Sequence, residues 1–170
     1  MTLVKSMIAS NWAYSEWATT TLLNACVALS PAELSRDLGL SHGSLLLTFR
    51  HIYISERFWA GCLIGNEIPQ FDTIAPEPVP QDLRIERLAS DWIPLWQIVG
   101  TWLDSLAEQD LAETLRCPFT AERVFHFPRW ELVSHLVNHG TLHRGQIVGM
   151  LRMLGVKPPN VDLMTYIQFR

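Results

Sequence analysis

Four long stretches of this chain place apolar residues at the three- and four-residue spacing of an amphipathic helix. They cover about residues 6–29, 41 or 44 to 64, 81–107 and 129–154. Ser30-Pro31 ends the first stretch, and Gly65 and Gly155 end the second and fourth, because the residue before proline leaves the α region and glycine commonly follows a helix. Four such helices within 170 residues predict an all-α four-helix bundle that forms a single domain, residues 1–170.

The segments between these stretches predict how the helices are joined. Residues 69–80 contain four prolines, which favours a long crossover connection over the end of the bundle rather than a tight turn. Pro94 falls inside the third stretch and predicts a kink or a break there. Residues 114–128 alternate apolar and polar side chains and predict a short irregular hairpin before the fourth helix. The tail from residue 160 to 170 predicts one short C-terminal helix.

Composition excludes several classes of protein. The chain has 13 Lys and Arg against 17 Asp and Glu, a net charge of −4 without a basic run, which argues against a nucleic acid partner. A hydrophobic content of 48% with 18% charged residues excludes disorder. No apolar stretch approaches the ~18 residues of a membrane span, and no signal peptide is recognisable. Cys26, Cys62 and Cys117 form no paired motif. We therefore expect a cytoplasmic protein with free thiols and no membrane partner.

Histidines at four-residue spacing mark the fourth helix. His135, His139 and His143 follow one another at i, i+4 and i+8, and two imidazoles at i and i+4 can bind one metal ion. All three cannot, because the outer two are about 12 Å apart along the axis. Around the helix axis, His143 is rotated about 40° from His139 in the direction that places it inside the apolar stripe. His135 is rotated about 40° in the opposite direction, which places it on the edge of the stripe. We therefore expect His139 and His143 to point into the bundle, His135 to flank them, and His42 and His126 to be peripheral.

A third ligand is expected from the second helix. His51 lies there on the same face as four apolar residues, Leu47, Ile54, Phe58 and Cys62. A lone inward histidine is more often a core residue than a ligand, but one that faces an inward pair predicts a metal site. The alternative is a hydrogen-bonded histidine cluster without an ion.

The motifs around these histidines resemble those of the DinB family, the DinB/YfiT-like metal-binding four-helix bundles related to thiol-dependent S-transferases. The resemblance rests on NWAYSEWA at 11–18, SLLLTFRH at 44–51, ERFW at 56–59, HLVNHGTLHRGQ at 135–146 and LRMLG at 151–155. It covers nearly the whole chain and is weakest between residues 71 and 130. It implies a bundle in which His51, His139 and His143 bind the metal.

Three neutral imidazoles leave coordination positions open, which is typical of a reactive rather than a structural metal site. Imidazole suits several divalent ions, and we expect zinc or nickel. Such an ion lowers the pKa of bound water toward ~7 and deprotonates a bound thiol. Two functions remain open. One is a metal-dependent enzyme of the thiol S-transferase or hydrolase type, acting on a small molecule such as a low-molecular-weight thiol. The other is a non-catalytic metal-binding or stress-response module.

Some residues near the motif have more than one interpretation. No general acid or base is assigned. Arg144 follows a ligand directly and would reach a substrate carboxylate, or else form an ion pair on the helix surface. Gln146 would fix the tautomer of a ligand from outside the metal's coordination shell. The seven Trp either all pack in the core and line the mouth, or some cover a face through which the chain forms a homodimer.

Overall fold

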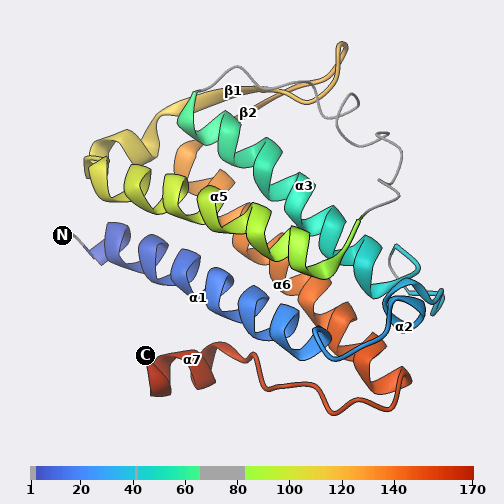
Figure 1. Cartoon of the computed structure of the whole chain (residues 1–170). Coiled ribbons are helices and arrows are strands. Elements are labelled where there is room, and N and C mark those ends of the chain that lie inside the picture. Colours follow the sequence, from blue (N-terminus) through green and yellow to red (C-terminus); the bar gives the residue numbers. More distant parts are fainter. Residues whose placement is uncertain (1–2, 41, 66–82) are drawn as a thin grey trace.

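Four long helices form the body of the molecule, as Figure 1 shows. The computed structural model describes residues 3–40, 42–65 and 83–170. The long helices are α1 (Leu3–Cys26), α3 (Leu45–Ile64), α5 (Ile85–Ser105) and α6 (Arg129–Met153). Both α1 and α3 pack against α5 and against α6, so that α1 and α3 are diagonally opposite. The predicted all-α four-helix bundle is confirmed.

The long helices run in two directions. In Figure 1, α3 and α5 run in one direction, and α1 and α6 run in the other. Because α3 and α5 are neighbours and parallel, α3 ends and α5 begins at opposite ends of the bundle. The predicted long crossover connection, with its proline-rich residues 69–80, lies outside the described part of the chain.

The two diagonal connections carry small elements of their own. The connection from α1 to α3 contains α2 (Pro31–Ser35). The connection from α5 to α6 contains the 3-10 turn η1 (Glu108–Ala112) and an antiparallel pair, β1 (Thr114–Pro118) and β2 (Val124–Pro128). After α6 the chain returns to α1, where α7 (Leu163–Phe169) packs. The hairpin and the short C-terminal helix were both predicted.

Local chemistry sets the helix ends. Of the two predicted starting positions, residues 41 and 44, the later one is correct: Ser44 caps α3, since its Oγ accepts the Leu47 N–H at 3.3 Å. Gly65 ends the same helix with a φ of 79°, a left-handed conformation that glycine adopts readily. The short α2 was not predicted, although Ser30 and Glu33 form a capping box. Pro94 lies within α5 without dividing it, so of the predicted kink or break, the break does not occur.

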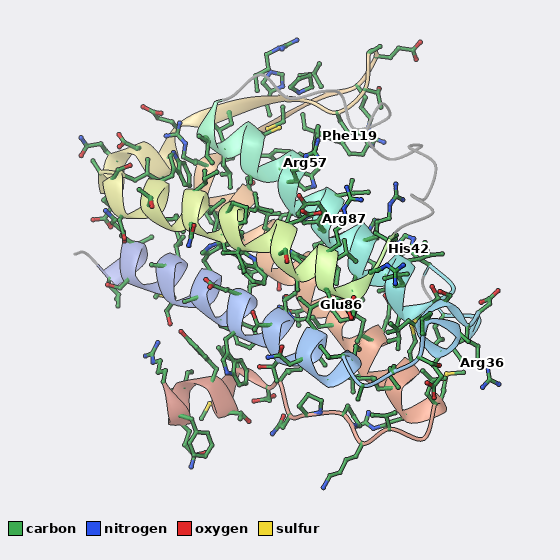
Figure 2. All side chains as sticks on the ribbon, viewed as in Figure 1. Arg36, His42, Arg57, Glu86, Arg87 and Phe119 are labelled. Atoms are coloured by element: carbon green, nitrogen blue, oxygen red, sulfur yellow. The ribbon has the colours of Figure 1, made fainter. Side chains whose placement is uncertain are left out.

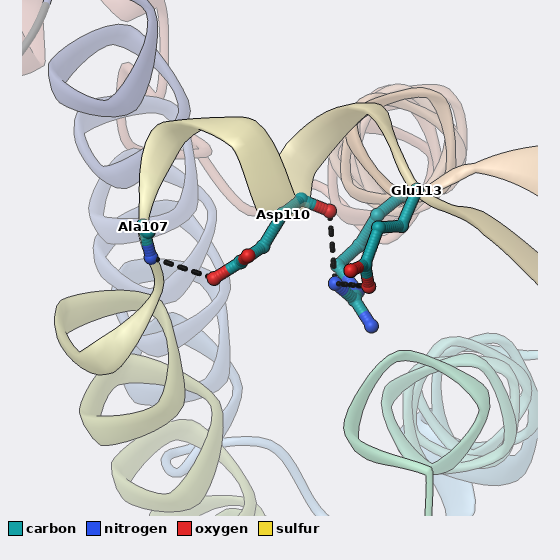
Figure 3. A network of polar contacts seen from close by, with 4 residues as sticks. Ala107, Asp110 and Glu113 are labelled. Atoms are coloured by element: carbon teal, nitrogen blue, oxygen red, sulfur yellow. Dashed lines mark hydrogen bonds and ion pairs between the residues drawn. The ribbon is translucent and has the colours of Figure 1, made fainter.

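A polar network connects η1 to the start of α6 (Figure 3). The Asp110 carboxylate accepts the Ala107 N–H at 2.8 Å. The Arg129 guanidinium donates to the Asp110 carbonyl oxygen and to the Glu113 carboxylate, each at 2.8 Å. Arg129 directly follows β2, so these bonds hold both ends of the hairpin close to η1.

The core is apolar and runs the length of the bundle. Four of the tryptophans are buried in it, namely Trp12, Trp59, Trp92 and Trp96. Trp130 is 45% exposed, so the tryptophans do not all pack in the core. The three cysteines are buried free thiols, as predicted. None of the described helices is long and apolar enough to cross a membrane.

Candidate metal centre

The packing of α3 against α6 brings three predicted histidines together. His51 of α3 and His139 of α6 place their Nε2 atoms 3.1 Å apart. The ring centroid of His143 lies 4.6 Å from that of His51 and 4.5 Å from that of His139. His143 is buried and the other two are half-buried. The residues selected from the apolar stripe therefore face one another across the interface between the two helices.

A fourth histidine joins this cluster. His42 stacks on His51 with 3.8 Å between ring centroids, and its ring lies 5.5 Å from that of His143. One ring nitrogen from each of His42, His51 and His143 lies within 4.8 Å of the others, a spacing at which the three could hold a metal ion. The expectation that His42 is peripheral is therefore wrong. Figure 2 shows His42 beside the first turns of α3.

A tight turn places His42 there. The Leu38 N–H donates to the Gly43 carbonyl oxygen at 2.7 Å, and the Gly43 N–H donates to the Leu40 carbonyl oxygen at 2.8 Å. Gly43 adopts a φ of 87°, which a residue with a side chain rarely adopts. The signal available in the sequence was a histidine directly before Gly43 and two residues before the helix cap Ser44. Helical periodicity cannot detect it, because the turn is not helical.

The two remaining histidines lie outside the cluster. His135 is exposed, and its ring centroid lies 5.7 Å from that of His139. It also meets Trp59 of α3 edge to face at 5.4 Å, so it flanks the cluster and joins the two helices, as predicted. His126 is exposed on β2, pairing in register with Arg116.

Burial keeps the clustered rings neutral. The pKa of His51 is lowered to about 3, mainly by burial and to a smaller extent by the neighbouring rings of His42, His143 and His139. Burial, and then chiefly His143, lowers the pKa of His139 to about 4. The pKa values of His42 and His143 are lowered as well, mainly by burial. At neutral pH the cluster therefore presents uncharged imidazoles, the form that binds metals.

Gln146 fixes one tautomer. Its Oε1 lies 2.7 Å from His143 Nδ1. An amide oxygen only accepts, so Nδ1 carries the proton and Nε2 keeps its lone pair. The predicted role of Gln146 is consistent with this contact. His139 Nδ1 is buried and has no hydrogen-bond partner among the described residues.

The spacing of the rings fits a metal ion. Two imidazole nitrogens that bind one tetrahedral zinc at 2.0–2.1 Å are about 3.3 Å apart. The 3.1 Å between the Nε2 atoms of His51 and His139 is close to that separation. The donor set, neutral imidazoles with one tautomer already fixed, is also that of a divalent transition metal site.

Both sequence-based interpretations of Arg144 are wrong. Its side chain is 1% exposed and points toward α1 rather than toward the histidines. The guanidinium donates to Ser15 Oγ at 2.8 Å, to Thr19 Oγ1 at 3.3 Å and to Thr141 Oγ1 at 2.9 Å. It is neither at the mouth of the histidine cluster nor on the surface.

Comparison with known proteins establishes the family. A family model described as "DinB family" matches residues 7–170. The chain belongs to the DinB family. It is 24% identical over 156 residues to Protein DinB of Bacillus subtilis strain 168, an alignment that covers 91% of this chain and 90% of the relative. This DinB-family chain also matches the crystal structure of a DinB-like protein from Bacillus cereus ATCC 10987. That match has a TM-score of 0.68 at 20% identity, covers 91% of this chain and 95% of the other, and shows a shared fold.

Proposed function

We propose that this DinB-family protein binds one divalent metal ion through His51, His139 and His143 and acts as a metal-dependent enzyme on a small thiol or on water. The observation that carries the proposal is the 3.1 Å between the Nε2 atoms of His51 and His139. Both rings are held by helices that pack along their length, so their approach is built into the bundle.

An ion explains this approach better than hydrogen bonding among the rings does. A single N–H···N bond satisfies one pair, whereas the cluster contains four rings whose low pKa values reflect burial. Buried polar nitrogens without partners are costly. An ion would accept several lone pairs at once, which supports a metal site over an ion-free cluster.

The chain's own residues would hold and orient the ion. His143, with Nδ1 turned to Gln146, presents Nε2 in a fixed direction. Zinc or nickel bound by three neutral imidazoles would retain its full charge, keep a position open and favour the thiolate or hydroxide form of what binds there. Trp59 and His135 form an aromatic wall beside His139, against which the apolar part of a substrate would lie.

His42 favours a second candidate. If its ring were a fourth ligand, a tetrahedral ion would have no open position, as in structural zinc sites. The protein would then be a non-catalytic metal-binding module. The contact of His42 with His51 and its spacing from His143 support this alternative.

Two measurements test the proposal. Elemental analysis of the purified protein should give about one zinc or nickel ion per chain, and a content near zero after reconstitution would overturn metal binding. Metal-loaded protein should then be screened for conjugation of small thiols to electrophiles and for ester hydrolysis. His42→Ala separates the two candidates. An enzyme with an open position should keep or gain turnover, whereas a closed site should show none in the wild type and gain a position that binds cyanide in the variant.

A further inference from the structure

A hollow lies beside α6, away from the histidine cluster. It has a volume of about 370 Å³ and is bounded by α1, α6 and the segment between α6 and α7. Its walls include Tyr14, Arg144, Gly145, Val148 and Arg152. It shares no residue with the histidine cluster, and no function discussed above uses it.

A buried cation lines this cavity, and no carboxylate of the described residues is bonded to it. Arg144 lines the cavity and is 1% exposed. Its Nη atoms donate to hydroxyl groups, and its buried Nε has no hydrogen-bond partner among the described residues. Buried charges in proteins are normally paired, because removal from water costs several kcal/mol. Glu56 attracts this charge electrostatically, and its carboxyl oxygen accepts a hydrogen bond from Trp92 Nε1 at 2.6 Å.

The remaining walls determine what would fit. Arg152 adds a second positive charge from the exposed side of α6. Val148, Pro158 and Pro159 supply apolar surface, and the Tyr14 hydroxyl donates to the Val161 carbonyl oxygen at 2.9 Å, which ties the outer segment to α1. The Asp162 carboxylate, which caps α7 through the Met164 N–H at 2.8 Å, also borders the cavity.

These charges select among anions. Arginine donates charge-assisted hydrogen bonds to carboxylate oxygens. The accessible donor here is the exposed Arg152, whereas the buried Arg144 contributes its positive charge. A doubly charged phosphate would be repelled by Asp162 more strongly than a singly charged carboxylate would. The apolar wall favours a carboxylate attached to an apolar body.

We propose that this cavity is a binding site for a small monocarboxylate with an apolar body. Its carboxylate accepts hydrogen bonds from Arg152 and is attracted by the buried charge of Arg144, and its body packs against Tyr14 and Val148. The site is independent of the metal centre.

Gly145 offers a direct test, because a Cβ added there meets no atom within 4 Å. Gly145 also lines the cavity, so Gly145→Leu adds a side chain at the cavity wall through a Cβ that displaces no protein atom. Gly100→Leu on α5 is the matched control, since its Cβ also meets nothing within 4 Å and it does not line the cavity. Benzoate is the probe, and benzamide is the uncharged isostere. Binding is followed by amide chemical shifts in ¹⁵N-labelled protein and by calorimetry.

We expect benzoate to shift the amides of Gly145 and Val148 in a saturable way. Gly145→Leu should weaken binding at least tenfold, and Arg152→Gln about threefold to tenfold. Gly100→Leu should leave it unchanged. Benzamide should bind at least tenfold more weakly than benzoate, and phosphate no better than benzamide. His51→Ala should bind benzoate as the wild type does, so failure at the metal centre is distinguishable. Equal binding of benzamide, full binding by Gly145→Leu, or no saturable shifts would each overturn the proposal.

Discussion

The Nε2 atoms of His51 and His139 lie 3.1 Å apart, although 88 residues separate the two histidines in the chain. The contact depends on the packing of α3 against α6 rather than on any local motif. One imidazole must donate a proton to the other at this distance, or both must share an ion. If the two rings share an ion, removal of either ring should reduce metal binding.

Removal of a ligand should abolish metal binding. We expect His51→Ala and His139→Ala to retain less than about a tenth of the wild-type metal, because two remaining imidazoles bind a divalent ion far more weakly than three. His135→Ala is the control, since this exposed ring only flanks the cluster. Elemental analysis after dialysis measures the content. Wild-type metal content in both ligand variants would refute the assignment.

The contact of Gln146 with His143 should affect affinity without removing a ligand. Gln146→Met preserves side-chain length but leaves His143 Nδ1 without its acceptor. Residues that hydrogen-bond to a metal ligand contribute about 10–100-fold to metal affinity. We expect Gln146→Met to lose affinity in this range in competition titrations with a chromophoric chelator. Gln97→Met, at an exposed position of α5, should leave affinity unchanged. An unchanged affinity in Gln146→Met would mean that the contact does not orient the ring.

The regular part of the structure was predictable from the sequence. Periodicity located all four long helices, and the apolar stripe selected the three histidines that now face one another. Both rest on the helical repeat, which translates sequence directly into a face. Ser44 and Gly65 then set the ends of α3 through local geometry.

The parts that were missed depend on non-helical backbone or on long-range packing. His42 reaches the cluster through a turn with positive φ at Gly43. Arg144 is buried because α1 supplies Ser15 and Thr19 to its guanidinium, and nothing in the spacing on α6 indicates those partners. For that reason the sequence predicted a contact of Arg144 with a substrate carboxylate, or an ion pair on the helix surface.

Glu56 should make the protein less stable as the pH rises. Burial raises the pKa of its carboxyl to about 7, against the lowering effects of its bond to Trp92 and of the Arg144 charge. Between about pH 4.5 and 7 the unfolded chain loses this proton while the folded chain keeps it. The free energy of unfolding therefore decreases across this window, by about 3 kcal/mol from this group, and becomes constant above it.

Glu56→Gln isolates this contribution, because the amide oxygen can still accept from Trp92 Nε1. We expect the variant to gain stability relative to the wild type as the pH is raised from 4.5 to 7, measured by urea unfolding at several pH values. The exposed Glu131→Gln variant serves as the control and should follow the wild type. A constant difference between Glu56→Gln and the wild type would show that this carboxyl has an ordinary pKa.

Two glycines on α6 should respond in opposite ways to alanine. A Cβ at Gly145 meets no atom within 4 Å, whereas a Cβ at Gly140 would lie 2.6 Å from Arg144 Nη1 and 3.4 Å from Ser15 Oγ. Gly145→Ala should stabilise the protein by up to about 1 kcal/mol, the difference in helix propensity. Gly140→Ala gains the same propensity but displaces a guanidinium that Ser15, Thr19 and Thr141 hold. Loss of hydrogen bonds to a buried charge costs about 1.5–3 kcal/mol each, so Gly140→Ala should be destabilised overall. Thermal and urea unfolding of the two variants measure the difference, and equal stabilisation of both would show that Arg144 moves freely within the core.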